Sequence, residues 1–326
     1  MPDVVFYEVF EEERRALKKF LDKNVRARFS ARTIQESGDR AAPARLISVR
    51  TQSRIPLEWA DDFDGIFTRS QGYDHLLAYR QAAGKNVVCG HIDEYCSRAV
   101  AEQAVLAMVA LWRKLKKQII SFEKFSRDGL TGLEYRGRRA LVVGVGNVGA
   151  QIVDIVTGLR MEARGVDPRR TLEDFHYVSL KQGLAWADVI FCACALTDST
   201  RNMMGYATLR DVKKGTIFIN VARGEISPAR DLERLMARGI LGGVALDVFD
   251  GEDRLADCLR GGRRAGDEKI RVVLRLKKLD NVLLTPHNAF NTREALEEKA
   301  RLSAKAVECF LRRRTFPALV PFLPEQ

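Results

Sequence analysis

The chain has 326 residues, of which 46% are hydrophobic and 30% are charged. This length accommodates two domains, each with its own core, and the composition is that of an ordinary globular protein. The formal net charge of +11 raises the question of nucleic-acid binding. However, basic and acidic residues are interspersed, and no base-stacking or zinc motif accompanies them. We therefore expect no nucleic-acid partner and attribute the charge to general solubility and attraction of anionic small molecules.

The sequence carries no signal for a membrane or a secretory route. No apolar run approaches the ~20 residues needed to cross a bilayer, and the N-terminus, MPDVVFYEVFEEERR, turns acidic where a signal peptide is apolar. The six cysteines show no C-x-x-C spacing, and Cys192 and Cys194 alternate along an apolar stretch, where buried free thiols are common. We predict a cytoplasmic protein with reduced cysteines, no membrane partner and no metal.

Short apolar segments alternate with helical or turn-rich stretches in the first hundred residues. The pattern predicts strands over residues 4–7, 45–49, 65–68 and 86–89 and a charged helix over residues 11–21. This alternation indicates a smaller α/β domain with a parallel sheet. Next, residues 99–120 are rich in Ala, Leu and Val, which predicts one long helix that connects two domains.

The stretch from Ala140 to Asp167 organises the rest of the chain. An apolar run suited to a buried strand precedes three glycines in G-x-G-x-x-G spacing, Gly144, Gly146 and Gly149. Apolar residues then recur at helical intervals. A second short strand candidate ends in Asp167. The order is therefore strand, glycine turn, helix, strand and acid.

Each glycine in this spacing has its own physical role. The first permits a sharp turn, the second lets backbone approach a pyrophosphate, and the third packs helix against strand, while the helix N-terminus offers N–H groups to the phosphates. We therefore predict a dinucleotide site; the alternative is a tight turn in a nucleotide-free α/β domain. Asp167 is suited to ribose hydroxyls and repels a 2′-phosphate, which favours NAD over NADP. Arg169 and Arg170 lie just beyond and weaken that preference.

Further apolar segments extend the alternating pattern toward the C-terminus. Residues 188–195, 215–221, 243–248 and 281–284 are predicted strands separated by helical stretches. That pattern indicates a doubly wound sheet, which binds ligands at the carboxyl ends of its strands. The final helix, over residues 293–311, and the tail have no sheet left to extend, so we expect them to return to the first domain.

Three residues suited to chemistry follow predicted strands at these carboxyl ends, namely Arg223, Glu252 and His287. An arginine can hold a substrate carboxylate bidentately, and a histidine can exchange a hydroxyl proton near neutral pH. A carboxylate on the far imidazole nitrogen fixes the tautomer and favours the protonated form. Taken alone, Arg223 also suits a surface ion pair and Glu252 an acidic turn. Together the three predict a site for hydride transfer.

Six segments resemble the D-2-hydroxyacid dehydrogenase family, in the family's order. They are TRSQGYD (68–74), AVAEQA (99–104), VGVGNVG (143–149), NVARGE (220–225), ALDVFDGE (245–252) and TPHNAF (285–290). The resemblance covers nearly the whole chain. It implies an α/β fold of two Rossmann-like or flavodoxin-like domains, with doubly wound parallel sheets and a cleft between them. Residues 1–98 and 290–326 would form the substrate domain, and residues 99–289 the NAD-binding Rossmann domain.

The resemblance also implies roles for individual residues around the substrate. Arg223 matches the family's substrate-binding arginine, His287 the acid/base, and Glu252 the carboxylate that pairs with it. The backbone amides of Gln71 and Gly72 match the loop that grips the substrate carboxylate. These five positions would therefore form the substrate end of the site.

Other matches concern the cofactor and the side-chain pocket. Asp247 matches the residue that holds the nicotinamide carboxamide, and Tyr95 resembles a tyrosine of the D-lactate dehydrogenase branch. Phe290 stands where glycerate and phosphoglycerate dehydrogenases usually carry small residues, and it suits either a compact apolar pocket or core packing. The residues expected to contact NAD are Gly144, Gly146, Asn147, Val148, Gly149, Asp167, Val221 and Asp247.

Spacing favours the D-lactate dehydrogenase branch, whereas two departures loosen that assignment. The interval from Glu252 to His287 is longer than in glycerate or phosphoglycerate dehydrogenases. The family's Ala-Glu-His signature ends in Gln103 here, and Ala195 replaces a proline. The insertion over residues 254–278 carries nine basic and three acidic residues and is either a solvated elaboration or a docking surface.

We therefore predict an NAD-dependent oxidoreductase that interconverts small 2-keto acids and D-2-hydroxy acids, similar to D-lactate dehydrogenase. The resemblance implies a homodimer, since the family usually dimerises through its nucleotide domain. Two alternatives stay open. One is a non-catalytic NAD(H)-responsive regulator of the corepressor type, and the other is a glycerate, phosphoglycerate or phosphite dehydrogenase on the same scaffold.

Overall fold

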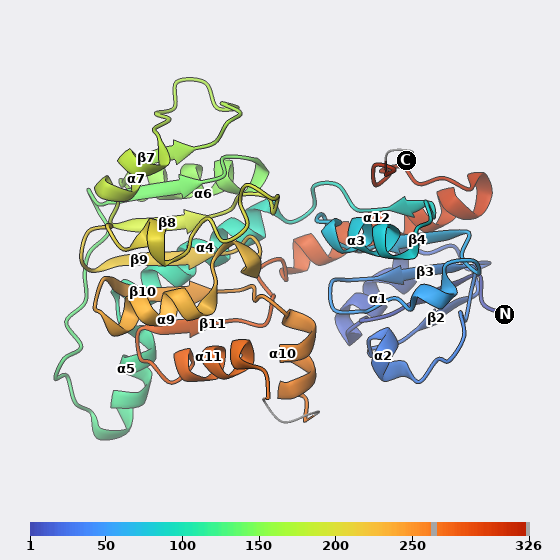
Figure 1. The fold of residues 1–326 in the computed structure, drawn as a ribbon, viewed down its shortest axis with the longest axis horizontal. Helices are drawn as coiled ribbons and strands as arrows, with labels where there is room; N and C mark the ends of the chain where they lie inside the picture. Colours follow the sequence, from blue (N-terminus) through green and yellow to red (C-terminus); the bar gives the residue numbers. More distant parts are fainter. Residues whose placement is uncertain (262–265, 324–326) are drawn as a thin grey trace. The chain divides into compact units, whose positions relative to one another are not determined.

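The structure of the chain is a computed structural model that describes residues 1–261 and 266–323. The chain folds into two compact units (Figure 1). Unit 1 consists of Met1–Cys96 and Asn291–Gln326, and unit 2 consists of Ser97–Phe290. The final helix therefore belongs to the unit in which the chain begins. No helix among the described residues is long and apolar enough to cross a bilayer.

Unit 1 is built on a five-stranded parallel sheet in the order β2-β1-β3-β4-β5. The strands are β1 (Val4–Phe6), β2 (Ala27–Phe29), β3 (Leu46–Val49), β4 (Gly65–Thr68) and β5 (Cys89–Gly90). Every residue of β1, β3 and β4 is buried, as expected for apolar strands that are covered on both faces.

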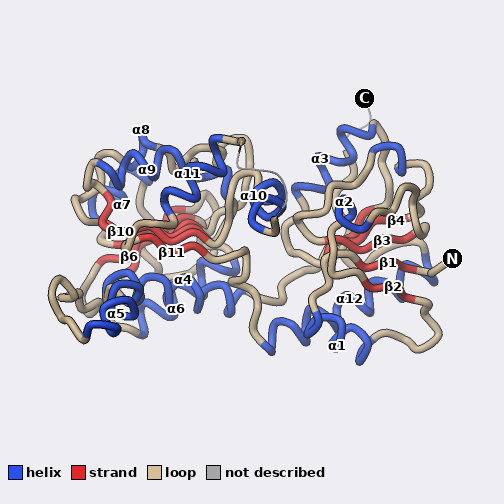
Figure 2. The backbone as a smooth tube through the Cα atoms, turned by 90° about the horizontal axis from the view of Figure 1, so that it is seen from below, coloured by secondary structure: helices blue, strands red, loops and turns tan. Residues whose placement is uncertain are grey.

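Helices cover both faces of this sheet (Figure 2). They are α1 (Glu11–Phe20), α2 (Ile34–Ser37), η1 (Leu57–Trp59), α3 (Asp74–Ala83) and α12 (Arg293–Arg313). Because side chains alternate along a strand, Val4 and Phe6 pack with α1 and α12, whereas Val5 packs with α2 and α3. The tail after α12 also joins unit 1, since the Val320 amide donates to the carbonyl of Cys89 at 2.9 Å.

Unit 2 contains a six-stranded parallel sheet in the order β11-β10-β9-β8-β6-β7. The strands are β6 (Arg139–Val143), β7 (Glu162–Val166), β8 (Val189–Cys192), β9 (Thr216–Asn220), β10 (Leu241–Leu246) and β11 (Val282–Leu284). The helices are α4 (Ser97–Trp112), α5 (Leu115–Ser121), η2 (Phe122–Lys124), α6 (Asn147–Gly158), α7 (Leu180–Trp186), α8 (Tyr206–Leu209), η3 (Gly224–Ile226), α9 (Ala229–Ala237), α10 (Glu252–Leu259) and α11 (Glu268–Leu276).

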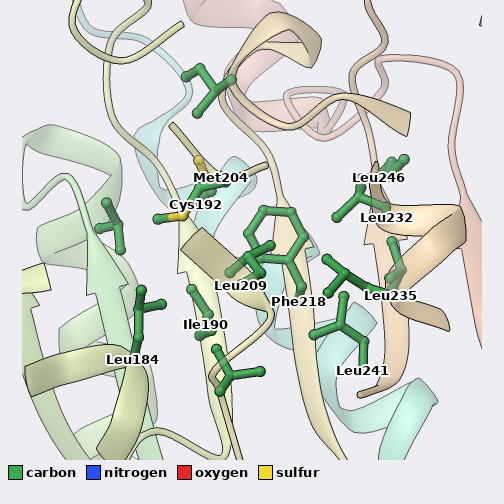
Figure 3. Packing of buried hydrophobic residues seen from close by; sticks show 14 of the residues in the cluster. Leu184, Ile190, Cys192, Met204, Leu209, Phe218, Leu232, Leu235, Leu241 and Leu246 are labelled. Atoms are coloured by element: carbon green, nitrogen blue, oxygen red, sulfur yellow. The ribbon is translucent and has the colours of Figure 1, made fainter. Parts of the chain in front are cut away.

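Apolar cores fill both faces of the unit 2 sheet. On one face α4 and α6 pack against the strands. On the other, α7, α8, α9 and α11 enclose a core in which Phe218 lies among leucines of these helices (Figure 3). The predicted α/β class, with two doubly wound parallel sheets, is confirmed.

The six strands of unit 2 end in one row. Their last residues are paired in register across the whole sheet, in the order Leu284, Leu246, Asn220, Cys192, Val143 and Val166. The residues that follow these positions therefore emerge along a single edge. Between β6 and β8 the strand order reverses, and sheets of this kind bind ligands at that point.

The prediction of a single helix over residues 99–120 is wrong. α4 ends at Trp112, Lys114 adopts a left-handed backbone with φ of 53°, and α5 starts afresh at Leu115. The amide of Leu133 donates to the carbonyl of Trp112 at 2.9 Å. The backbone of a distant segment therefore donates a hydrogen bond to the last residue of α4. No local sequence pattern indicates this hydrogen bond.

Other differences concern short edge strands and strand ends. β2 has three residues and an exposed Arg28 in its middle, so it was not predicted. β5 occupies Cys89–Gly90 rather than residues 86–89, and β8 stops at Cys192 rather than at residue 195. Within the basic insertion the described residues form most of α10 and all of α11, and residues 262–265 lie outside the described part.

Candidate active site

The glycine turn connects β6 to α6 at the point where the strand order reverses. Gly144 has φ of +90°, and a Cβ there would lie 2.4 Å from the Cα of Cys194. A Cβ on Gly149 would lie 1.9 Å from the carbonyl oxygen of Gly144, so α6 approaches the turn as closely as backbone permits. Protein packing therefore explains the first and third glycines of the motif.

Gly146 has a different environment. A Cβ added there meets nothing within 4 Å, and its φ of −81° suits any residue. Packing within the protein thus gives no reason for a glycine. A ligand that approaches the backbone closely would explain the glycine. Gly146 is also the N-cap of α6, where the helix presents unpaired N–H groups to an anion. Asn147 and Val148 form the first turn of that helix.

Asp167 follows β7 and binds the glycine turn directly. Its Oδ2 accepts a hydrogen bond from the Val145 amide at 2.8 Å, and Oδ1 accepts one from the Arg169 amide at 2.8 Å. Two acceptor positions remain on this half-buried carboxylate, because an ionised carboxylate offers about four. Asp167 therefore shapes the turn and still has the capacity to bind ribose hydroxyls.

His287 and Glu252, which lie 35 residues apart in the sequence, meet at the edge of the sheet. Nδ1 of His287 lies 2.9 Å from each carboxylate oxygen of Glu252. Both side chains are about four-fifths buried, with exposed fractions of 21% and 17%. Glu252 is the first residue of α10, where the helix dipole favours a negative charge. Among the described residues Nε2 of His287 has no hydrogen-bond partner, so it is the nitrogen left for proton exchange.

Asp247 anchors the loop that carries His287. Its carboxylate accepts hydrogen bonds from the Thr285 hydroxyl at 2.6 Å and from the amides of Asn288 and Ala289, both at 2.9 Å. The His287 amide donates to the Asp247 carbonyl at 2.9 Å. Burial raises the pKa of Asp247 above its usual value, although these three donors oppose the shift. The structure thus gives Asp247 a positioning role in addition to the cofactor contact implied by resemblance.

Arg223 and the β10 loop are brought together by Gly224. A Cβ on Gly224 would lie 2.0 Å from the carbonyl carbon of Phe249, so the loops after β9 and β10 are in direct backbone contact. Arg223 is half-buried, and its Nη1 donates to the carbonyl of Ala222 at 2.8 Å. The loop that bears Arg223 and the loop that leads into α10 and Glu252 are therefore neighbours.

Asn220 and Thr285 have positioning roles that the sequence patterns did not predict. Buried Asn220 donates through Nδ2 to the carbonyl of Arg223 at 2.9 Å and accepts from the Ala222 amide at 2.9 Å. Thr285 holds Asp247 as described above. Each is a polar residue at or just after the end of an apolar strand, and that change in polarity is the signal that identifies them.

The remaining predicted positions are distributed over both units. Gln71 and Gly72 lie in the loop after β4, where the Ser70 hydroxyl donates to the carbonyl of Gly72 at 2.8 Å. Tyr95 is half-buried near the end of the first segment of unit 1. In unit 2, Val221 follows β9, and Phe290 is the last residue and is buried. The described geometry therefore joins Glu252, His287 and Asp247 in one cluster and places Gln71, Gly72 and Tyr95 in the other unit.

A doubly wound sheet with a glycine turn at the reversal point and a His–Glu pair along the same edge defines a dinucleotide-binding oxidoreductase. The profile described as "D-isomer specific 2-hydroxyacid dehydrogenase, NAD binding domain" matches residues 105–289. The chain belongs to this family. It is an NAD-dependent enzyme of the D-2-hydroxyacid dehydrogenase type.

Similar proteins include several that bear the name D-lactate dehydrogenase. The D-lactate dehydrogenase kk1H of Curvularia clavata is 31% identical over 253 residues, which cover 76% of this chain and 69% of that protein. The Escherichia coli D-lactate dehydrogenase is 30% identical over 238 residues and 71% of each chain. The Aquifex aeolicus D-lactate dehydrogenase structure, complexed with NAD and lactic acid, has a TM-score of 0.82 and 27% identity over 97% of this chain and 98% of that one.

Proposed function

We propose that the chain reduces small 2-keto acids to D-2-hydroxy acids with NADH, in the manner of a D-lactate dehydrogenase. The observation that carries this proposal is the contact of His287 Nδ1 with both oxygens of Glu252 at 2.9 Å. It lies on the edge of the sheet that also bears the glycine turn. The names of the similar proteins support lactate-like substrates.

The residues of unit 2 fit the cofactor. The open position at Gly146 and the N-terminus of α6 suit a pyrophosphate, and Asp167 suits the ribose hydroxyls. Bound NADH supplies the hydride that reduces the keto carbon. The residues that we assign to its binding are Gly144, Gly146, Asn147, Val148, Gly149, Asp167, Val221 and Asp247.

The acid–base step follows from the geometry of the pair. Glu252 accepts a hydrogen bond from the Nδ1–H of His287, which fixes the ring orientation and stabilises the imidazolium. His287 donates a proton from Nε2 to the oxygen of the substrate carbonyl as the hydroxyl forms. In the reverse direction the same nitrogen removes that proton.

The substrate carboxylate needs a cationic partner and backbone donors. We assign Arg223 to the bidentate contact and the amides of Gln71 and Gly72 to the remaining hydrogen bonds. Tyr95 and Phe290 are assigned to the walls of the side-chain pocket. The domain roles follow, with unit 1 as the substrate domain and unit 2 as the NAD-binding domain.

We further propose a cytoplasmic homodimer that associates through unit 2. The six free cysteines suit a reducing compartment. α5 has no buried residue, although a helix of seven residues is marginal without tertiary packing. Ile119 in this helix and Phe122 and Phe125 just after it are apolar, and the exposed fractions of these residues are 66%, 74% and 78%. A second copy of the chain would cover these apolar side chains.

Replacement of the two members of the pair tests the catalytic assignment. His287→Ala should lower kcat for keto-acid reduction by ~10²- to 10⁴-fold, the usual contribution of a general acid, while the Kd for NADH stays unchanged. Glu252→Gln should lower kcat by a smaller factor, because the amide oxygen still accepts a hydrogen bond from Nδ1–H but no longer offers a negative charge to the imidazolium.

The exposed His176 of the same unit provides a matched control, and His176→Ala should retain wild-type kcat. Equal losses of turnover and NADH affinity in His287→Ala would contradict the assigned role. A Glu252→Gln variant with wild-type kcat would contradict the assignment of Glu252.

A further inference from the structure

Two cysteines lie where β8 ends, beside the glycine turn. The Sγ atoms of Cys192 and Cys194 are 4.0 Å apart, and both thiols are free. Cys192 is fully buried and paired in register with Val143 of β6 on one side and Asn220 of β9 on the other. Cys194 lies beyond the strand and is half-buried. One thiol is therefore fixed by the sheet, and the other lies just outside it.

The backbone of Cys194 packs directly on the turn. A Cβ on Gly144 would lie 2.4 Å from both the N and the Cα of Cys194, so there is no space between the two segments. Ala193 and Ala195 flank Cys194, so neither a bulky side chain nor a proline ring opposes a local change of backbone. A displacement of residue 194 must therefore be transmitted to the turn.

We propose that Cys192 and Cys194 form a reversible disulfide that weakens NADH binding. This inference rests on the proposed placement of the NADH pyrophosphate at the glycine turn. A disulfide needs its sulfurs ~2.05 Å apart, and they are 4.0 Å apart in the dithiol form. Because the sheet holds Cys192 in place, Cys194 must move toward it when the disulfide forms. The glycine turn, which contacts Cys194, then loses the conformation that binds the phosphates.

The oxidation balances with a peroxide as the oxidant. The Cys194 thiolate attacks one oxygen of hydrogen peroxide, the O–O bond breaks, and the departing hydroxide takes up a proton to become water. Cys192 then attacks the sulfur of the resulting sulfenic acid. The S–S bond forms, the S–O bond breaks, and the hydroxyl leaves with the Cys192 proton as a second water. The two thiols lose two electrons, which the peroxide gains, and a dithiol reductant reverses the reaction.

The electrostatics of the two thiols support this order of events. The contact with Cys192 lowers the pKa of the Cys194 thiol below its usual value, although burial opposes the shift. The same contact, together with burial, raises the pKa of Cys192 well above its usual value. The half-buried Cys194 is thus the thiol that ionises first and meets the oxidant.

Coupling between the two events is reciprocal. If the disulfide weakens NADH binding by a given factor, NADH must favour the dithiol over the disulfide by the same factor. For a two-electron couple each tenfold factor corresponds to about 30 mV. Saturating NADH should therefore raise the reduction potential of the pair, and the cofactor protects its own site from oxidation.

The test uses the reduced full-length chain and hydrogen peroxide. Trypsin releases residues 182–201 as a peptide that contains these two cysteines and no other. We expect this peptide to lose two hydrogens in mass and the Kd for NADH to rise at least ~10-fold, with both changes reversed by dithiothreitol. Titration against glutathione buffers, with and without NADH, measures the potential.

Variants separate the disulfide from other effects of the oxidant. Cys194→Ser, and Cys192→Ala as a second variant that keeps a small apolar side chain in the core, should bind NADH equally before and after peroxide. Cys309→Ser, which removes a half-buried thiol of α12 in unit 1, should respond as the wild type does.

The proposal would be overturned if the peptide of residues 182–201 did not lose two hydrogens in mass after peroxide treatment. It would also be overturned if oxidation of Cys194 ended at the sulfenic acid. A disulfide that leaves NADH binding unchanged would likewise overturn it. If the reduced chain failed to bind NADH at all, the proposed cofactor site would fail, and the coupling with it. The mass measurement distinguishes that result from a failure of the disulfide to form.

Discussion

At the scale of single residues, two carboxylates fix different parts of the segment that carries His287. Asp247 binds the backbone of the loop through the amides of Asn288 and Ala289, and Glu252 binds the ring. His287 itself has φ of 50°, a left-handed conformation that is uncommon for a non-glycine residue. The ring is therefore positioned before any substrate arrives, which is the condition for efficient proton transfer.

The three motif glycines should respond differently to substitution. Gly149→Ala places a Cβ 1.9 Å from the Gly144 carbonyl, so we expect both a loss of stability of ~1–3 kcal/mol and a loss of NADH affinity. Gly146→Ser adds a side chain to open space and keeps a good N-cap residue. It should lower NADH affinity at an unchanged Tm. Thermal unfolding and NADH titration of both variants measure the difference, and a Gly146→Ser chain with wild-type affinity would contradict the pyrophosphate assignment.

At the scale of elements, a buried ion cluster joins α1, β4 and α12 of unit 1. Glu13, Arg69, which directly follows β4, and Lys299 are all fully buried. The Arg69 Nε donates to Glu13 Oε1 at 3.0 Å, and Lys299 Nζ lies 2.6 Å from the same oxygen. Replacing one member of such a cluster leaves uncompensated charge in the core, which typically costs several kcal/mol.

This cluster predicts a loss of stability in acid. Burial raises the pKa of Glu13, but Lys299 and Arg69 outweigh it and hold the pKa at about 2, against an ordinary value of 4.5. Because the folded pKa is depressed, the stabilisation is complete above pH 4.5 and disappears as the pH falls toward 2, by on the order of 3 kcal/mol.

Hydrogen exchange of peptides from α1 and α12, corrected for intrinsic rates, measures this loss between pH 7 and pH 3. Glu13→Gln should show weaker protection at pH 7 and a smaller further loss in acid. If acid reduced protection equally in the variant and the wild type, Glu13 would not be the responsible group.

Much of unit 2 was predictable because its strands are buried on both faces and read as continuous apolar runs. The positions of Arg223, Glu252 and His287 after three such runs were enough to predict that they gather at one edge. Features set by distant partners were not predictable. The break at Lys114 depends on Leu133, and the contact between the loops of Gly224 and Phe249 depends on the sheet register.

At the scale of the whole molecule, the apolar surface around α5 should determine the oligomeric state. Ile119→Asp combined with Phe122→Asp should convert a dimer of 36.7 kDa chains into monomers, because two charges would be buried at the interface. Sedimentation velocity at micromolar concentration measures this. Leu57→Asp, at an exposed apolar position of unit 1, is the control and should leave the dimer intact. A wild-type chain that sediments as a monomer would contradict the proposal.

The central claim is that this chain reduces a small 2-keto acid with NADH, and one measurement tests it most directly. The loss of NADH absorbance is followed with pyruvate, phenylpyruvate, 2-ketoisocaproate, hydroxypyruvate and glyoxylate, with NADPH in parallel. We predict rapid turnover of at least one compact keto acid, faster with NADH than with NADPH because Asp167 repels a 2′-phosphate. No turnover of any of the five acids, despite demonstrable NADH binding, would contradict it.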